Sequence, residues 1–204
     1  MTAPRALYES AARSFADLVR RIPDDRWDGP GLGDWTLRDL VGHTSRSLVT
    51  VSTYLGAPAQ REDVTSAADY YVRVLELSAA IGGDAILERG RQAGRDLGAD
   101  PVAAVDTLVS TVLADLDAVD DPLIEVIGGL GIRLSSYLPT RVFEFAVHGI
   151  DIARAAGIDH APPDDVLADA AALAARIGVA LGHGPAVLLA LTGRSELPPG
   201  FSVV

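Results

Sequence analysis

Residues 140–157 read TRVFEFAVHGIDIARAAG, an apolar run that nevertheless holds two carboxylates and an imidazole, at Glu144, Asp151 and His148. The spacing of its apolar residues predicts a helix over 140–156 that ends at the final glycine. Glu144 and His148 are four residues apart, so both lie on one face of this helix, one turn from each other. Asp151 follows three residues later on roughly the same side. The presence of titratable side chains on an otherwise apolar helix therefore calls for an explanation.

Two explanations fit the pair. Glu144 and His148 at this spacing form a two-ligand clamp for a divalent metal, with Asp151 able to hold the other ring nitrogen of the imidazole. Alternatively, a carboxylate on apolar surface needs a cation, and Arg141, one turn earlier, supplies a simple ion pair. From spacing alone, a solvated helix face or this ion pair is favoured, because a metal site needs a third ligand from elsewhere in the chain.

The composition predicts one globular domain with a sizeable core, because 49% of the 204 residues are apolar and 22% are charged. The formal net charge is −11, and all 17 basic residues are arginine. Such a chain has no general attraction for nucleic acid or for an anionic membrane. The absence of cysteine excludes disulfides and thiolate metal sites, so any nucleophilic thiol must come from outside the chain.

The location expected from the sequence is the cytoplasm. The first ten residues lack the apolar core of a signal peptide. No apolar run reaches the roughly 18 residues needed to span a bilayer. Abundant alanine, arginine, aspartate and glycine, with no lysine, suggest a high-GC bacterial source.

Helical spacing dominates the rest of the chain, which indicates an all-α fold. The predicted helices span 3–22, 37–55, 63–81, 84–97, 101–119, 140–156, 164–181 and a short segment from 184. Thr36 is expected to cap the second helix, and the sequence IGGD at 81–84 is expected to break the third. Residues 122–137 hold two short apolar runs around glycines and predict a small hairpin or loop excursion. The sum is a single-domain helical bundle.

The third metal ligand has to come from the remaining histidines. His160 and His183 lie in turns, where we expect exposure to solvent and a helix cap, respectively. His43 lies in mid-helix, one turn after Asp39 and next to apolar neighbours. From spacing alone, a hydrogen-bonded core histidine fits His43 about as well as a metal ligand does.

Two stretches carry a family resemblance. Residues 21–47, RIPDDRWDGPGLGDWTLRDLVGHTSRS, resemble the N-terminal signature of the mycothiol-dependent maleylpyruvate isomerase family, a tryptophan in a Pro/Gly loop followed by W-T-x-x-D-L-x-x-H. Residues 140–157 are similar to the second signature, E-x-x-x-H-x-x-D-x-x-x-A-x-G. The metal-binding N-terminal domain of that family is a DinB-like four-helix bundle. The resemblance implies this bundle for residues 1–160, with 161–204 as C-terminal helices and an extended tail packed on the same domain.

The resemblance also implies a metal site and a cosubstrate. By position, the metal triad of the family falls on His43, Glu144 and His148, which leaves coordination positions open for catalysis. Zinc fits these ligand types, and nickel or another divalent ion remains an alternative. The implied chemistry uses mycothiol, the low-molecular-weight thiol of actinobacteria, and an electrophilic substrate. A metal lowers the pKa of a bound thiol, and the absence of cysteine agrees with an external thiol.

Further residues are candidates around this site. Asp151, Arg141 and Asp39 are candidates for a general acid or base, and Asp39 either orients His43 or faces solvent. Trp35 is expected to pack its loop on the bundle. Arg46 and Arg73 are candidates for binding an anionic substrate, although spacing does not single them out.

Three functions remain open from the sequence. The first is a metal- and mycothiol-dependent transferase or isomerase, the second a metal-dependent hydrolase on the same site, and the third a non-catalytic metal- or ligand-binding module in a stress response. The isomerase proper has a further C-terminal domain of mixed α/β type, and residues 161–204 are too few for it. The resemblance also allows a homodimer.

Overall fold

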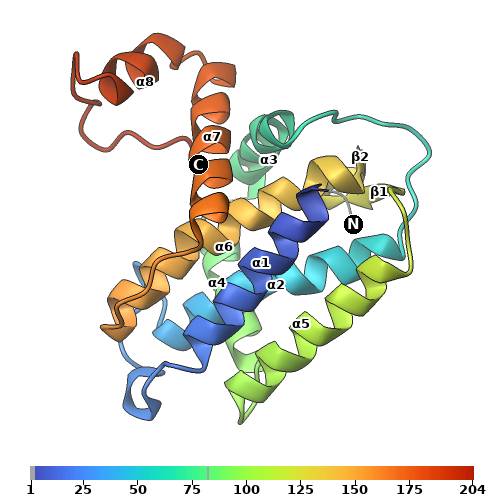
Figure 1. Cartoon of the computed structure of the whole chain (residues 1–204), viewed down its shortest axis with the longest axis vertical. Helices are drawn as coiled ribbons and strands as arrows, with labels where there is room; N and C mark the ends of the chain where they lie inside the picture. The colour runs from blue at the N-terminus through green and yellow to red at the C-terminus, as the bar shows by residue number, and fades with distance from the viewer. Residues whose placement is uncertain (1–2, 82) are drawn as a thin grey trace.

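Four long helices enclose the hydrophobic core of this all-α protein (Figure 1). The computed structural model describes residues 3–81 and 83–204. The four bundle helices are α1 (Ala3–Val19), α2 (Leu37–Leu55), α5 (Pro101–Asp117) and α6 (Leu134–Ala156). Both α1 and α2 pack against α5 and α6, so the four helices close a ring around the core. The predicted all-α, DinB-like bundle is therefore confirmed.

Helix α2 begins where the sequence predicts. The side chain of Thr36 accepts a hydrogen bond from the backbone N–H of Asp39, and the carboxylate of Asp39 accepts one from the backbone N–H of Thr36, both at 3.1 Å. This reciprocal pair is a capping box, which fixes the first turn of the helix. The apolar face of this helix is buried in the core, through Leu37, Leu40, Val41, Leu48 and Val51. Each contributes about 1.5–3 kcal/mol of hydrophobic stabilisation.

The loop before α2 is held by its tryptophans. A short 3-10 helix, η1 (Asp24–Arg26), leads into Trp27, which is buried and stacks under the guanidinium of Arg38 at 5.5 Å. The indole Nε1 of Trp35 donates a 2.9 Å hydrogen bond to the carbonyl oxygen of Leu87 on helix α4 (Gly83–Asp96). Both tryptophans therefore pack this loop onto the helices.

A two-stranded antiparallel sheet precedes α6. Strand β1 (Leu123–Val126) pairs with β2 (Leu130–Arg133), and the turn η2 (Ile127–Gly129) joins them through two glycines with positive φ. The predicted hairpin is present but shorter than predicted.

Helix α6 begins at Leu134, six residues before the predicted start at 140, so the prediction was wrong there. The first turn of α6 is stabilised from the preceding loop, because the carboxylate of Asp121 accepts hydrogen bonds from the backbone N–H and the hydroxyl of Ser135 at 2.8 and 2.9 Å. The helix also includes Pro139, a residue that argues against a helix when the sequence is read alone.

Two further helices cover the bundle. Helix α3 (Ala67–Ile81) packs against α6 and α7, and α4 (Gly83–Asp96) packs closely against α2. The close approach needs glycine, because a Cβ on Gly42 would lie 2.3 Å from the backbone nitrogen of Gly94. Helix α3 begins four residues later than predicted. Residue 82, within the predicted break, lies outside the described residues.

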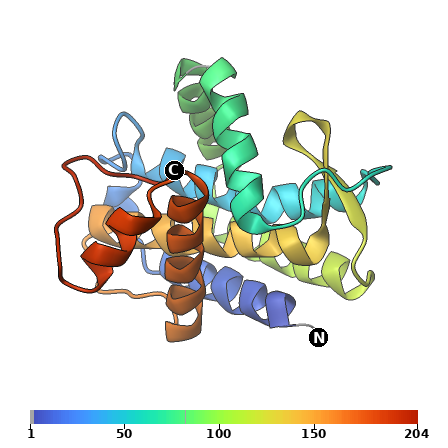
Figure 2. The same ribbon diagram turned by 90° about the horizontal axis from the view of Figure 1, so that it is seen from above.

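The C-terminal segment consists of α7 (Asp164–Ala180), α8 (Gly184–Leu191) and an irregular tail. Helix α7 packs on α6 and α3, whereas α8 packs on α7 at the side away from α5 (Figures 1 and 2). The boundary at residue 160 stays a prediction.

In the described part of the chain, no single helix has the length and apolarity to cross a membrane. The helical segments Ala85–Asp96 and Pro101–Asp117 reach that length and apolarity only when taken together, and they are bent by 98° relative to each other.

Candidate metal centre

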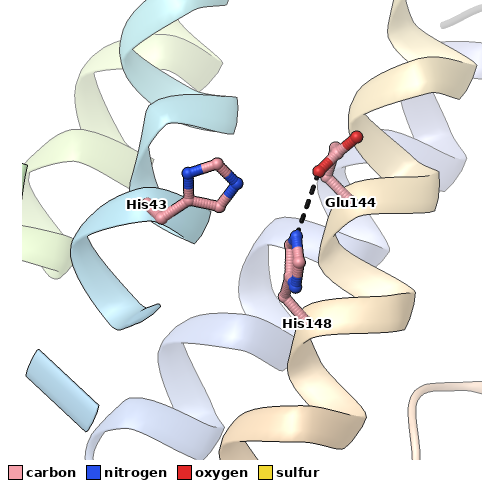
Figure 3. Close-up of side chains that lie close together, drawn as sticks. All are labelled: His43, Glu144 and His148. Carbon is pink, nitrogen blue, oxygen red and sulfur yellow. Dashed lines mark ion pairs between the residues drawn. The ribbon is translucent and has the colours of Figure 1, made fainter. Parts of the chain in front are cut away.

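Helices α2 and α6 bring three ligand-type side chains together inside the bundle. His43 comes from α2, and Glu144 and His148 come from α6, one turn apart (Figure 3). One ligand atom from each side chain lies within 4.8 Å of the other two. The two imidazole rings are 5.1 Å apart between centroids and nearly perpendicular. All three side chains are partly buried. The structure thus assembles one cluster from segments about a hundred residues apart in the sequence.

Glu144 is ionised in this setting. Its Oε1 accepts a 2.7 Å hydrogen bond from the hydroxyl of Tyr71, and its Oε2 lies 3.3 Å from Nε2 of His148. Burial acts to raise the pKa of Glu144, but the hydrogen bond from His148 and the charge of Arg141 outweigh burial and lower the pKa to about 2. The carboxylate is therefore negatively charged at neutral pH.

His148 lies between two carboxylates. Its Nε2 faces Glu144, and its Nδ1 lies 3.3 Å from Oδ2 of Asp151. Burial lowers the pKa of His148, yet the interactions with Asp151 and Glu144 outweigh this effect and raise the pKa to about 9. Asp151 occupies the position from which a carboxylate fixes the orientation of a metal-binding imidazole.

His43 differs from an ordinary core histidine. Its ring stacks on Trp35 with centroids 4.5 Å apart. Within the described part of the chain, its Nδ1 is buried without a hydrogen-bond partner. Burial and the nearby charge of His148 lower the pKa of His43 to about 4, so the ring is neutral at pH 7. Figure 3 shows a ring nitrogen of His43 directed toward Glu144 and His148.

The side chains present fit a divalent metal. A neutral imidazole from His43, the imidazole of His148 and the carboxylate of Glu144 are the nitrogen and oxygen ligands of open catalytic zinc sites. The ring nitrogen of His43 that faces Glu144 and His148 is free to act as a ligand, because no hydrogen bond to it is found among the described residues. The same ligand set also accepts other divalent transition metals.

The simple alternative of an Arg141–Glu144 ion pair is not what the structure shows. The Nε of Arg141 donates a 3.0 Å hydrogen bond to the hydroxyl of Thr140. Its guanidinium lies over the rings of Tyr70 and Tyr137, at 5.8 and 5.1 Å from their centroids. Arg141 affects Glu144 through its charge at longer range, and no ion pair joins the two side chains among the described residues.

The other residues predicted for the site lie apart from the cluster. The carboxylate of Asp39 accepts the capping hydrogen bond at the start of α2, so it neither orients His43, one of its two predicted roles, nor simply faces solvent. Arg73 is half exposed and pairs with Asp69 and Glu76 on the surface of α3. Arg46, in contrast, lines a cavity next to the cluster.

The two remaining histidines lie outside the cluster. His183 precedes α8 without a side-chain capping hydrogen bond, and His160 is partly buried rather than exposed.

Tyr71 is the contributing residue that sequence reasoning missed. It lies on α3, 73 residues before its partner Glu144, and no spacing pattern links the two. The available signal was weak: Tyr70 and Tyr71 are adjacent tyrosines in an amphipathic helix, a pattern that indicates core packing as readily as a site.

The comparisons with known proteins agree with this geometry. The family model for the mycothiol maleylpyruvate isomerase N-terminal domain matches residues 8–153, which is more than two thirds of the chain and includes all three members of the cluster. No curated protein and no solved structure gave a match. The chain therefore belongs to the mycothiol maleylpyruvate isomerase N-terminal domain family.

Proposed function

We propose that this protein binds a divalent metal, with zinc the best fit, through His43, Glu144 and His148. We further propose that it acts in the cytoplasm as a mycothiol-dependent thiol transferase or isomerase. The observation that carries the proposal is the convergence of one ligand atom each from His43, Glu144 and His148 within 4.8 Å of one another, with a ring nitrogen of His43 directed at the other two side chains. Membership of a family named for mycothiol supports the choice of thiol.

The bound metal would supply one effect, a lowered pKa of a coordinated thiol that makes thiolate available near neutral pH. The chain's own residues prepare the ligands. Asp151 accepts a hydrogen bond from Nδ1 of His148, which leaves Nε2 facing the cluster. Tyr71 donates to Oε1 of Glu144 and limits the rotation of its carboxylate. The thiol itself must be an external molecule, because the chain has no cysteine.

Space for a small electrophile adjoins the cluster. A cavity of about 200 Å³ is lined by His43 and Glu144 together with residues of α2, α3, α4 and α6. This volume is below the usual 300–1,000 Å³ of pockets for drug-sized ligands, so it suits a substrate of a few carbon atoms.

The test combines metal content with thiol consumption. The purified protein is expected to hold about one divalent ion per chain, measured by mass spectrometry. When metal-loaded, it should accelerate the consumption of mycothiol by a small electrophile such as chloroacetate, in which the thiolate displaces chloride. A Glu144→Gln variant should lose most of both properties, whereas His183→Gln, at an exposed histidine outside the cluster, should keep them.

Each other result decides against the proposal in a distinct way. Stoichiometric metal without thiol consumption, but with hydrolysis of an activated ester, would favour a metal-dependent hydrolase on the same site. A protein that holds no stoichiometric metal, and whose Glu144→Gln variant behaves as the original, would exclude both enzyme functions and leave a non-catalytic binding module.

A further inference from the structure

Large apolar side chains are exposed mainly on the C-terminal segment. Among the described residues eight such side chains are exposed, and six of them belong to residues 179–204, whereas Leu32 and Val49 are the other two. These six form what we call the C-terminal apolar patch: Val179, Leu188, Leu189, Leu191, Leu197 and Val204. Concentrated apolar surface of this kind is uncommon on monomeric proteins and marks a surface that binds a partner.

Helix α8, at the centre of the patch, is apolar on every side and yet lies at the surface. Its sequence, GPAVLLAL, has no polar side chain. Val187 packs against Gly178 of α7, whereas Leu188 and Leu191 are 63% and 75% exposed. Figure 1 shows α8 beyond α7, away from the four-helix ring. A helix that is apolar all round is normally buried, so the outer side of α8 needs a cover.

A groove lies beside the exposed leucines, between α7, α8 and the tail. It has a volume of about 510 Å³ and is lined by alanines of α7 and by apolar residues of α8 and the tail. Within the described lining, Ser202 is the one polar side chain, and its hydroxyl already donates a hydrogen bond to the carbonyl oxygen of Val204. Small-molecule sites usually hold several polar groups that orient the ligand. The groove therefore suits apolar side chains of a protein better than a small polar ligand.

The charge distribution argues against a membrane or a nucleic acid as the partner. Residues 177–193 contain no aspartate, glutamate, lysine or arginine, the longest such run in a chain whose net charge is −11. Helices that lie on membranes usually carry lysine and arginine on their polar face, and the eight residues of α8 are too few to span a bilayer. Nucleic acid requires positive charge. The remaining partner is an equally apolar protein surface.

The C-terminal apolar patch is complementary to itself. Leucines protrude from α8 directly beside a groove whose α7 wall consists of Ala171, Ala174 and Ala175. A two-fold interface needs both features on one surface, because each copy must supply the protruding groups and receive those of the other. Two copies with a net charge of −11 repel each other, and this repulsion is weakest where neither surface is charged. A second copy of this chain therefore matches the patch in shape and in charge.

We propose that the protein forms a two-fold symmetric homodimer through the C-terminal apolar patch, in which Leu188 and Leu189 of each copy pack into the groove of the other. This surface lies outside residues 8–153, which match the family model, so it belongs to the C-terminal segment of this chain and not to the family domain. It does not rest on the proposed metal function, because His43, Glu144 and His148 all lie outside it.

Sedimentation equilibrium of the full chain over a range of concentrations tests the proposal. Leu189→Glu places a charge in the patch, and Ala171→Phe fills the groove without adding a charge. Leu32→Glu is the matched control, because Leu32 and Leu189 are both 41% exposed but Leu32 lies in the loop before α2. Thermal unfolding verifies that each variant is folded, and metal content is measured on the same samples.

The unaltered protein is expected to reach twice the 21.3 kDa mass of one chain and to dissociate on dilution. A symmetric dimer carries each substitution twice, so Leu189→Glu buries two carboxylates and should weaken dimerisation by about a hundredfold or more. Ala171→Phe should weaken it by about tenfold or more, and Leu32→Glu by less than about twofold. Added salt should strengthen the dimer, because it screens the repulsion between two acidic chains.

A protein that stays monomeric at every concentration would overturn the proposal. So would a dimer whose affinity is unchanged in a folded Leu189→Glu variant, or is reduced equally by Leu189→Glu and Leu32→Glu. A monomer that sediments with phosphatidylcholine vesicles would assign the patch to a lipid surface and would likewise refute the homodimer. Each of these results leaves the proposed metal function standing, since metal content is measured separately.

Discussion

Tyr71 on α3 donates a 2.7 Å hydrogen bond to Oε1 of Glu144 on α6 and so joins the covering helix to the cluster of His43, Glu144 and His148. The same hydroxyl lies 3.1 Å from the carbonyl oxygen of Thr140, one turn earlier on α6. Burial and the charge of Glu144 raise the pKa of Tyr71, so the phenol keeps its proton and remains a donor. The orientation of the Glu144 carboxylate thus depends on a helix outside the four-helix ring.

Replacing Tyr71 by phenylalanine should weaken metal binding without unfolding the protein. The variant loses the hydrogen bond to Glu144 but keeps the ring that packs on Phe143 at 5.3 Å. Removing such an outer partner of a metal ligand typically costs 10–100-fold in metal affinity, so we expect a loss of about that size in competition titrations with a chelating dye.

Tyr8→Phe is the control for this prediction. In the unaltered protein the buried hydroxyl of Tyr8 donates a hydrogen bond to the carbonyl oxygen of Ser47 and makes no hydrogen bond to the cluster. Both variants should lose a similar amount of stability, but Tyr8→Phe should keep the original metal affinity. Equal metal affinity in both variants would show that Tyr71 has no influence on Glu144.

The parts of this structure that were predictable from sequence are those governed by local chemistry. The capping box of Thr36 with Asp39 lies within four residues, and the Glu144–His148 pair lies within one helical turn. Such features follow from helix geometry, because partners at fixed spacing share one face whatever the rest of the chain does. The choice of His43 as the third member of the cluster required the family signature in addition to spacing.

The parts that could not be predicted depend on how distant helices pack. Tyr71 lies on α3, where the sequence shows helical character but no motif. Its relation to the centre arises only when this helix folds over it. The early start of α6 has the same origin. Pro139 in the local sequence argues against a helix there, whereas Asp121, fourteen residues before Ser135, accepts hydrogen bonds from the first turn. Arg141 lies one turn before Glu144, and the sequence allowed an ion pair between the two side chains. In the structure the guanidinium of Arg141 lies over the rings of Tyr70 and Tyr137 instead.

Replacing His43 by leucine should remove the metal and leave the metal-free protein as stable as before. Among the described residues, His43 makes no hydrogen bond, and its Nδ1 is buried without a partner. Substituting an apolar group for an unpaired buried polar one is nearly neutral or stabilising, within about 1 kcal/mol. Unfolding measured in the presence of a chelator, together with metal analysis, checks both halves of this expectation.

A contrasting variant sharpens the comparison. His148→Leu removes contacts with both Glu144 and Asp151 and leaves two carboxylates facing an apolar side chain. We expect it to lose metal and also to destabilise the metal-free protein. A marked destabilisation by His43→Leu alone would mean that His43 is a structural residue after all.

Metal binding should release about one proton at pH 7. In the metal-free protein the pKa of Glu144 is about 2 and that of His43 about 4, so both are already deprotonated. The pKa of His148 is about 9, because Asp151 and Glu144 outweigh the opposing effect of burial. Metal must therefore displace this proton, and the apparent affinity should rise roughly tenfold per pH unit from about pH 5 to pH 8. Calorimetry in buffers of different ionisation enthalpy counts the protons.

Asp151→Asn tests the origin of this dependence. Removing the carboxylate beside Nδ1 lowers the pKa of His148, so fewer protons should be released at pH 7 and the affinity should depend less steeply on pH. Absence of proton release in the unaltered protein at pH 7 would contradict the raised pKa of His148.

Asp39→Ala should lower stability without affecting the metal centre. Asp39 accepts the hydrogen bond from the backbone N–H of Thr36 that closes the capping box of α2. Loss of a helix cap costs about 0.5–2 kcal/mol, which corresponds to a decrease in melting temperature of a few degrees for a chain of this size. Thr36→Ala removes the other half of the same box and should cause a similar decrease. Metal affinity and turnover should be unchanged in both variants. If Asp39 instead acted as a general acid or base, Asp39→Ala would reduce turnover by about a hundredfold or more while Thr36→Ala would not.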